Sequence, residues 1–128
     1  MGYKRILIVE DDMPRQSTLK TAAERLDVLA DIYVTDNLED AKSYISGHSD
    51  VELVIMGWDF PTSIANMMIK EENGEKLLRF VKNCGIKAVV CSNRAEQLKK
   101  DPELSGTPVI LPIPLGAIEE RLKERLKY

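Results

Sequence analysis

The chain is poor in the residue types that build metal centres and disulfide frameworks. Its 128 residues include two cysteines and one histidine. Cys84 and Cys91 lack the C-x-x-C spacing, and His48 is remote from both in the sequence. The pattern therefore indicates neither a zinc site nor a disulfide framework. We expect both cysteines to be small core or helix-end residues.

Long apolar runs are also missing. No run approaches the ~18 to 20 residues that a bilayer-spanning helix needs, and the N-terminus has no basic segment followed by an apolar one. We therefore expect a cytoplasmic protein with no membrane partner. At this length the sequence has room for one domain, residues 1–128, and we expect no output domain.

Charge of either sign is plentiful but nearly balanced. Lys and Arg number 18 against 21 Asp and Glu, which gives a net charge of −3. An acidic chain is a poor match for a phosphate backbone, so we expect no nucleic-acid partner. Residues 1–64 hold 12 acidic and 6 basic residues, whereas residues 65–128 hold 9 and 12. This polarity predicts one acidic and one basic face.

Apolar patterning predicts the fold. Continuous apolar runs suit strands that are buried on both faces of a parallel sheet, and they occur at residues 6–9, 53–56, 88–91 and 109–111. Residues 31–35 alternate as an edge strand does, and Pro108 and Pro112 confine the last strand to the other edge. Apolar residues at helical spacing mark four of the intervening or following segments as helices. These apolar residues are 19, 22, 23 and 26 in the first, 41, 44 and 45 in the second, 77, 78 and 81 in the third, and 115, 118, 122 and 126 in the last.

Alternating strands and helices predict an α/β, doubly wound, five-stranded parallel sheet in the order 2-1-3-4-5. The first helix is expected over residues 14–27, and the segment between the fourth and fifth strands is expected to hold only a short polar helix near residues 95–100. A ligand site in such a sheet lies beyond the carboxyl ends of the strands, where the strand order reverses.

Three adjacent carboxylates, Glu10, Asp11 and Asp12, follow the first strand at this edge. Clustered acids repel one another unless a cation or a proton relieves them, which favours a hard-metal site. Acids also stabilise the first turn of a helix. The spacing alone leaves both interpretations open.

The whole chain resembles a response regulator receiver domain, the phospho-acceptor module of two-component signalling, which has a flavodoxin-like fold. The resemblance depends on residues 6–14, which look like the opening of that domain. Further matches follow in order: Asn73-Gly74 before Leu77-Leu78 resembles the loop into the third helix, Ser92 the switch hydroxyl, and Pro114 the proline after the fifth strand.

The resemblance implies phosphoryl transfer from a histidine kinase to an aspartate at the end of the third strand. That chemistry uses Mg²⁺ held by the strand-one acids, here Glu10 and Asp11, together with a lysine and a hydroxyl. The family places its acceptor aspartate four residues before a proline, and the residue at that position here is Gly57. It places its lysine directly before the proline that follows the fifth strand, and the residue before Pro114 here is Ile113. Glycine supplies no nucleophile, and isoleucine balances no charge.

These departures predict a degenerate receiver, not an enzyme, that signals by protein–protein interaction without phosphorylation and binds Mg²⁺ weakly or not at all. Asp59 is the alternative acceptor, and a histidine kinase would be a partner only in that case. An extended strand would place Asp59 about 6.6 Å beyond position 57. A small Mg²⁺-dependent phosphohydrolase is a further alternative, although it lacks an obvious nucleophile or base.

The resemblance also predicts where partners bind. Receivers use the fourth helix, fifth strand and fifth helix, so we expect a protein partner or a homodimer there, through Arg94, Gln97, Lys100, Ile110 and residues 121–127. Residues 60–72 form an unusually long connection with five apolar residues at positions 64, 65 and 67–69. We expect a helical turn that packs them over the site, the alternative being a partner surface. Trp58 is expected to serve packing.

Overall fold

A parallel sheet forms the centre of the computed structural model, which describes residues 2–27, 29–112 and 114–126. Its strand order is β2-β1-β3-β6-β7, and every neighbouring pair is parallel. The strands are β1 (Arg5–Val9), β2 (Asp31–Thr35), β3 (Val51–Met56), β6 (Lys87–Cys91) and β7 (Val109–Ile110). The predicted doubly wound sheet and its order are confirmed.

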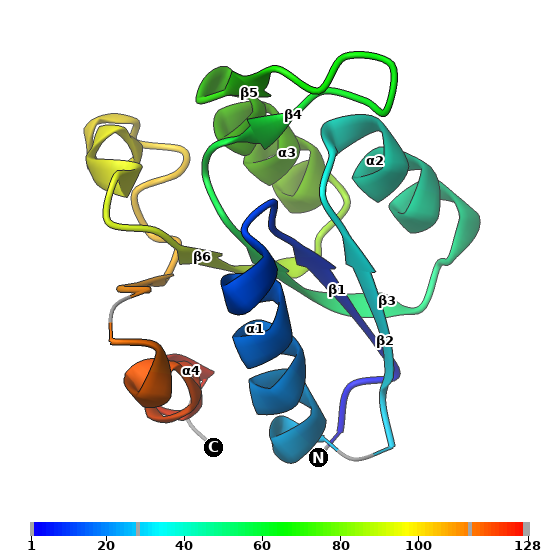
Figure 1. The fold of residues 1–128 in the computed structure, drawn as a ribbon, viewed down its shortest axis with the longest axis vertical. Coiled ribbons are helices and arrows are strands. Elements are labelled where there is room, and N and C mark those ends of the chain that lie inside the picture. Colours follow the sequence, from blue (N-terminus) through cyan, green and yellow to red (C-terminus); the bar gives the residue numbers. More distant parts are fainter. Residues whose placement is uncertain (1, 28, 113, 127–128) are drawn as a thin grey trace.

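Helices cover both faces of the sheet (Figure 1). They are α1 (Met13–Leu26), α2 (Leu38–Gly47), α3 (Glu72–Asn83) and α4 (Ile118–Leu126), with short 3-10 helices η1 (Ala95–Lys100) and η2 (Leu115–Ala117). Within β1, Leu7 and Val9 belong to the core that includes α2 and α3, whereas Ile6 and Ile8 belong to the core that includes α1 and α4. This two-sided burial explains the continuous apolar runs.

Side chains at the helix starts fix where the first two helices begin. The Asp12 side chain accepts a hydrogen bond from the Arg15 backbone N–H (3.1 Å) and caps α1. Asn37 caps α2 in the same way, through the Asp40 N–H (2.9 Å). Helix α1 thus starts at Met13, with Pro14 in the first turn, where its missing N–H is tolerated. None of the described helices is long and apolar enough to span a bilayer.

The expected helical turn over residues 60–72 is wrong. This connection forms an antiparallel hairpin of β4 (Phe60–Pro61) and β5 (Ile69–Lys70). Two anchors hold it: Asn73 Nδ2 donates to the Phe60 carbonyl (2.7 Å), and the Glu39 N–H donates to the Thr62 carbonyl (2.8 Å). The hairpin buries Phe60 but leaves four other apolar side chains exposed, with Ile64, Met67, Met68 and Ile69 between 52% and 82% accessible.

Candidate functional site

A pocket of about 270 Å³ lies at the carboxyl ends of β1, β3 and β6. This is the edge at which a doubly wound sheet places its ligand site. Nine of the described residues line it: Glu10, Asp11, Arg15, Trp58, Asp59, Ile69, Ser92, Asn93 and Arg94. The structure therefore brings together the acid pair, the predicted switch hydroxyl and the fallback aspartate.

Glu10 is the buried acid of this pocket, with 2% of its surface exposed. Its Oε2 accepts a hydrogen bond from the Asp12 backbone N–H (3.1 Å). Its Oε1 lies 4.0 Å from Arg15 Nη1, too far for a hydrogen bond, and has no hydrogen-bond partner among the described residues. Burial raises the pKa of Glu10 to about 7, against the lowering effects of the Asp12 N–H and Arg15. The neighbouring Asp11 carboxylate raises it further.

The three acids of the cluster occupy different places in the structure. Asp12 acts at the helix start, because its side chain caps α1 and lies 3.5 Å from Arg15 Nε. Glu10 and Asp11 line the pocket instead. Sequence reasoning missed Arg15, which is within ion-pair distance of both Glu10 and Asp12.

Gly57 lies directly against Glu10. The Gly57 N–H donates to the Val9 carbonyl (2.8 Å), which continues the β1–β3 pairing past the end of β3. A Cβ at position 57 would lie 2.8 Å from Glu10 Oε1 and 3.4 Å from its Cδ. The space in which a side chain at position 57 would begin is therefore occupied by the Glu10 carboxylate. Ile113, the other predicted departure, lies outside the described residues.

Asp59 lines the pocket although it lies beyond the end of β3. Its Oδ2 is 3.1 Å from Arg94 Nη1, and its Oδ1 is buried without a hydrogen-bond partner among the described residues. The sequence singled out Arg94 only as an interface residue. Its place beside Asp59 follows from the ends of β3 and β6 meeting at one edge of the sheet.

Of the two predicted switch residues, only Ser92 is among the described residues that line the pocket. Ser92 is buried, lines the pocket, and accepts a hydrogen bond through Oγ from the Arg94 N–H (3.0 Å). Pro114 precedes η2 and is not among the described residues that line the pocket. Asn73 and Gly74 lie in the first turn of α3 rather than in the loop before it.

Trp58 is a core residue, as expected, but it also reaches the pocket. It is 2% exposed, and its Nε1–H has no acceptor among the described residues. Helix α3 approaches it so closely that a Cβ on Gly74 would lie 2.3 Å from the Trp58 carbonyl oxygen. Glycine is therefore required at position 74 by this close approach.

The pocket does not fit the Mg²⁺ that the resemblance implies. Mg²⁺ needs near-octahedral oxygen donors. Over the described ranges, no group of three or more His, Cys, Asp or Glu side chains is placed to hold a metal ion. Gly57 supplies no ligand, and Asp59 is paired with Arg94. We therefore derive no chemistry through a metal ion.

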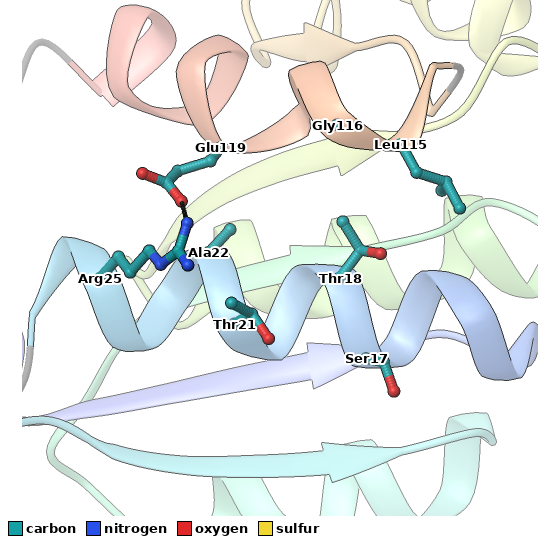
Figure 2. Close-up of a pocket in the computed structure, with 8 residues that line it drawn as sticks. All are labelled: Ser17, Thr18, Thr21, Ala22, Arg25, Leu115, Gly116 and Glu119. Carbon is teal, nitrogen blue, oxygen red and sulfur yellow. Dashed lines mark hydrogen bonds and ion pairs between the residues drawn. The ribbon is translucent and has the colours of Figure 1, made fainter.

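A second pocket, of about 250 Å³, lies between α1 and the start of α4. Figure 2 shows Arg25 and Glu119 pointing toward each other across this gap, at 2.8 Å, with Thr18 and Leu115 further along it. Arg25 and Lys123 lower the pKa of Glu119. Because Glu119 is already paired with these two cations, this pocket presents no unpaired charge. The Arg25–Glu119 ion pair links α1 to α4.

One residue of the predicted partner surface, Ile110, is buried in the structure. Ile110 is 3% exposed and belongs to the core, so it is not available to a partner. Leu111, just past β7, is 52% exposed and lies in a groove of about 580 Å³ together with Leu98, Lys99 and Arg125. The side chain of Gln97 and the whole of Lys127 lie outside the described part of the chain.

Comparison with known proteins identifies the fold. No family model and no curated protein matches this chain. A two-component response regulator from Clostridium difficile matches with a TM-score of 0.68 at 18% identity, over 97% of this chain and 96% of that one. A CheY-like response regulator receiver domain from Methylobacillus flagellatus matches with a TM-score of 0.63 at 22% identity, over 97% and 99%.

A third match is the co-crystal structure of the Saccharomyces cerevisiae histidine phosphotransfer signaling protein Ypd1 with the receiver domain of its downstream response regulator Ssk1. Its TM-score is 0.62 at 19% identity, over 94% of this chain and 87% of that one. At such identities the likeness establishes the fold. The chain has the α/β fold of response regulator receiver domains.

Proposed function

We propose that this chain is a receiver-like signalling module that acts by protein–protein interaction and is not phosphorylated at the family position. One observation carries the proposal: Glu10 Oε1 lies 2.8 Å from where the Cβ of a side chain at position 57 would be. The acceptor carboxylate is thus missing, and the neighbouring acid fills the space where it would begin.

The charges that remain support the same proposal. Asp59 is paired with Arg94, and Glu10 and Asp12 share Arg15. Position 113 holds isoleucine, so no lysine is available there to balance a phosphoryl group. A phosphoryl group at this edge would join three carboxylates, Glu10, Asp11 and Asp59, already gathered in one pocket.

Intact mass spectrometry after incubation with acetyl phosphate and Mg²⁺ tests the proposal. We expect no mass gain on the unmodified chain and no consumption of acetyl phosphate beyond its spontaneous hydrolysis. The matched positive variant is Gly57→Asp with Ile113→Lys, which returns a nucleophile and a cation while Ser92 stays in place. We expect partial labelling of the double variant and less of either single variant. A phosphoryl adduct on the unmodified chain would contradict the proposal, and turnover without an adduct would indicate a phosphohydrolase.

Asp59 is a second candidate acceptor, favoured by its place in the same pocket as Glu10 and Asp11 and by its buried, unpartnered Oδ1. A histidine kinase or histidine phosphotransfer protein would then be a partner, as Ypd1 is for the Ssk1 receiver domain. In that case Asp59→Asn abolishes the adduct, whereas Arg94→Ala, which frees the carboxylate, increases it.

The partner surface that we propose comprises η1, β7 and α4. The exposed Leu111 and the groove that it shares with Lys99 and Arg125 support this choice. A homodimer and a different protein partner both use such a surface, and sedimentation velocity over a range of concentrations distinguishes them. Leu111→Asp is expected to lower the association in either case. The control is Leu29→Asp, which alters an even more exposed leucine far from this surface in the sequence.

A further inference from the structure

Three residues that line the pocket at the ends of β1, β3 and β6 carry buried hydrogen-bonding groups that no described residue satisfies. Glu10 Oε1 and Asp59 Oδ1 are buried acceptors without a hydrogen-bond donor among the described residues. The Trp58 Nε1–H, in a side chain that is 98% buried, is a donor without an acceptor. Buried polar groups are normally paired. Each unpaired group costs free energy, which a ligand that pairs with it would recover.

When Glu10 is ionised, the net charge of the pocket favours a cation. Three carboxylates, of Glu10, Asp11 and Asp59, face two guanidinium groups, of Arg15 and Arg94. Arg94 already pairs with the other oxygen of Asp59, at 3.1 Å, and Arg15 approaches Glu10 no closer than 4.0 Å. The two free carboxylate oxygens therefore lack close positive partners within the described chain.

The rim of the pocket is apolar on one side. Ile69, in β5 of the exposed hairpin, lines the pocket while 56% of its surface remains accessible. Lysine and arginine carry a charged head on a hydrocarbon stem, so they can reach buried carboxylates while the stem contacts apolar groups at the surface. A metal ion has no stem, and the donor set does not suit one.

We propose that this pocket binds a lysine or arginine side chain of a protein partner, whose N–H groups reach Glu10 Oε1 and Asp59 Oδ1 and whose stem packs on Ile69. The inference rests on the proposed function, since it names the chemistry by which the partner is recognised. Arg94 connects the two surfaces, because it lines the pocket and immediately precedes η1.

The experiment uses the full chain and two synthetic peptides, acetyl-Leu-Lys-Leu-amide and the same peptide with norleucine in place of lysine. Trp58 is the only tryptophan, so its indole N–H gives one resonance that reports on a residue lining the pocket. We expect the lysine peptide to shift this resonance saturably and the norleucine peptide to bind at least about tenfold more weakly, because charge-assisted hydrogen bonds are lost.

Matched variants locate the contact. Glu10→Gln and Asp59→Asn should each weaken binding of the lysine peptide about tenfold, whereas Glu24→Gln, an exposed acid on α1, should leave it unchanged. On the hairpin, Ile69→Ser should weaken binding. Ile64→Ser, which alters an even more exposed isoleucine outside the pocket, should not.

Four results would overturn the inference: equal binding of the two peptides, unchanged binding by both carboxylate variants, a shift as strong with butylammonium chloride, or displacement of the peptide by MgCl₂. The third would indicate a small-amine site, and the fourth a divalent-cation site. The proposed function is tested separately, because it is contradicted by a phosphoryl adduct on the unmodified chain or by turnover of acetyl phosphate, and neither result depends on peptide binding.

Discussion

Replacing Glu10 by glutamine should remove part of the pH dependence of folding. Burial raises the pKa of Glu10 from its ordinary value of 4.5 to about 7 in the folded chain. The folded state therefore binds this proton more tightly than the unfolded state. The resulting stabilisation is fully present below about pH 4.5 and is lost as the pH rises through 7.

The magnitude follows from that pKa rise. One pH unit corresponds to about 1.4 kcal/mol, so the full effect is about 3 kcal/mol, of which roughly 2.5 kcal/mol is lost between pH 5 and pH 8. Glutamine has nearly the same size and retains an oxygen that can accept from the Asp12 N–H. The free energy of unfolding of Glu10→Gln, relative to the unmodified chain, should therefore increase by 2 to 3 kcal/mol, in rough terms, over this range.

Urea unfolding followed by Trp58 fluorescence, at four pH values from 5 to 8, measures this difference. Carboxylates that are distant from Glu10 also titrate, but they contribute equally to both proteins and cancel in the comparison. Glu24→Gln, which alters an exposed acid on α1, should give a flat difference. A flat difference for Glu10→Gln as well would refute the argument, because it would mean that Glu10 is compensated by a cation in the folded state.

Two further predictions concern packing and thiol reactivity. Gly74→Ala should lower the free energy of unfolding by about 1 to 3 kcal/mol, because the added Cβ would lie 2.3 Å from the Trp58 carbonyl oxygen. The control is Gly47→Ala, which should be neutral or stabilising because nothing lies within 4 Å of its Cβ. Equal melting temperatures for the two variants would contradict this prediction. Cys84 is exposed and should react with Ellman's reagent in the folded chain. Cys91 is buried, and burial raises its pKa to about 12, so it should react only on unfolding. Reaction of both thiols at the same rate in the native chain would contradict this prediction.

The sequence by itself determined the order of the sheet and the positions of most helices. A strand that is buried on both faces must be apolar at every position, so residues 6–9 and 53–56 could be recognised without knowing their neighbours. Prolines flanking the last strand identified it as an edge, as β7 is. The identity of residue 57 likewise required no structure, because a glycine cannot accept a phosphoryl group.

The tertiary structure alone decided how the site is arranged, because its contacts join residues that are far apart in the chain. Arg94 follows β6 and pairs with Asp59 beyond β3, a contact that no spacing rule predicts. The hairpin replaced the expected helical turn because Asn73 and Glu39 hold its backbone from two different helices.

Burial is the other property that only the fold could assign. Three consecutive acids have similar propensities in the sequence, yet Glu10 is enclosed against Gly57 while Asp12 caps α1 at a partly exposed position. Ile110 was expected on the partner surface but packs in the core. Which acid titrates near neutral pH, and which apolar side chains meet a partner, depends on where the sheet and its helices exclude water.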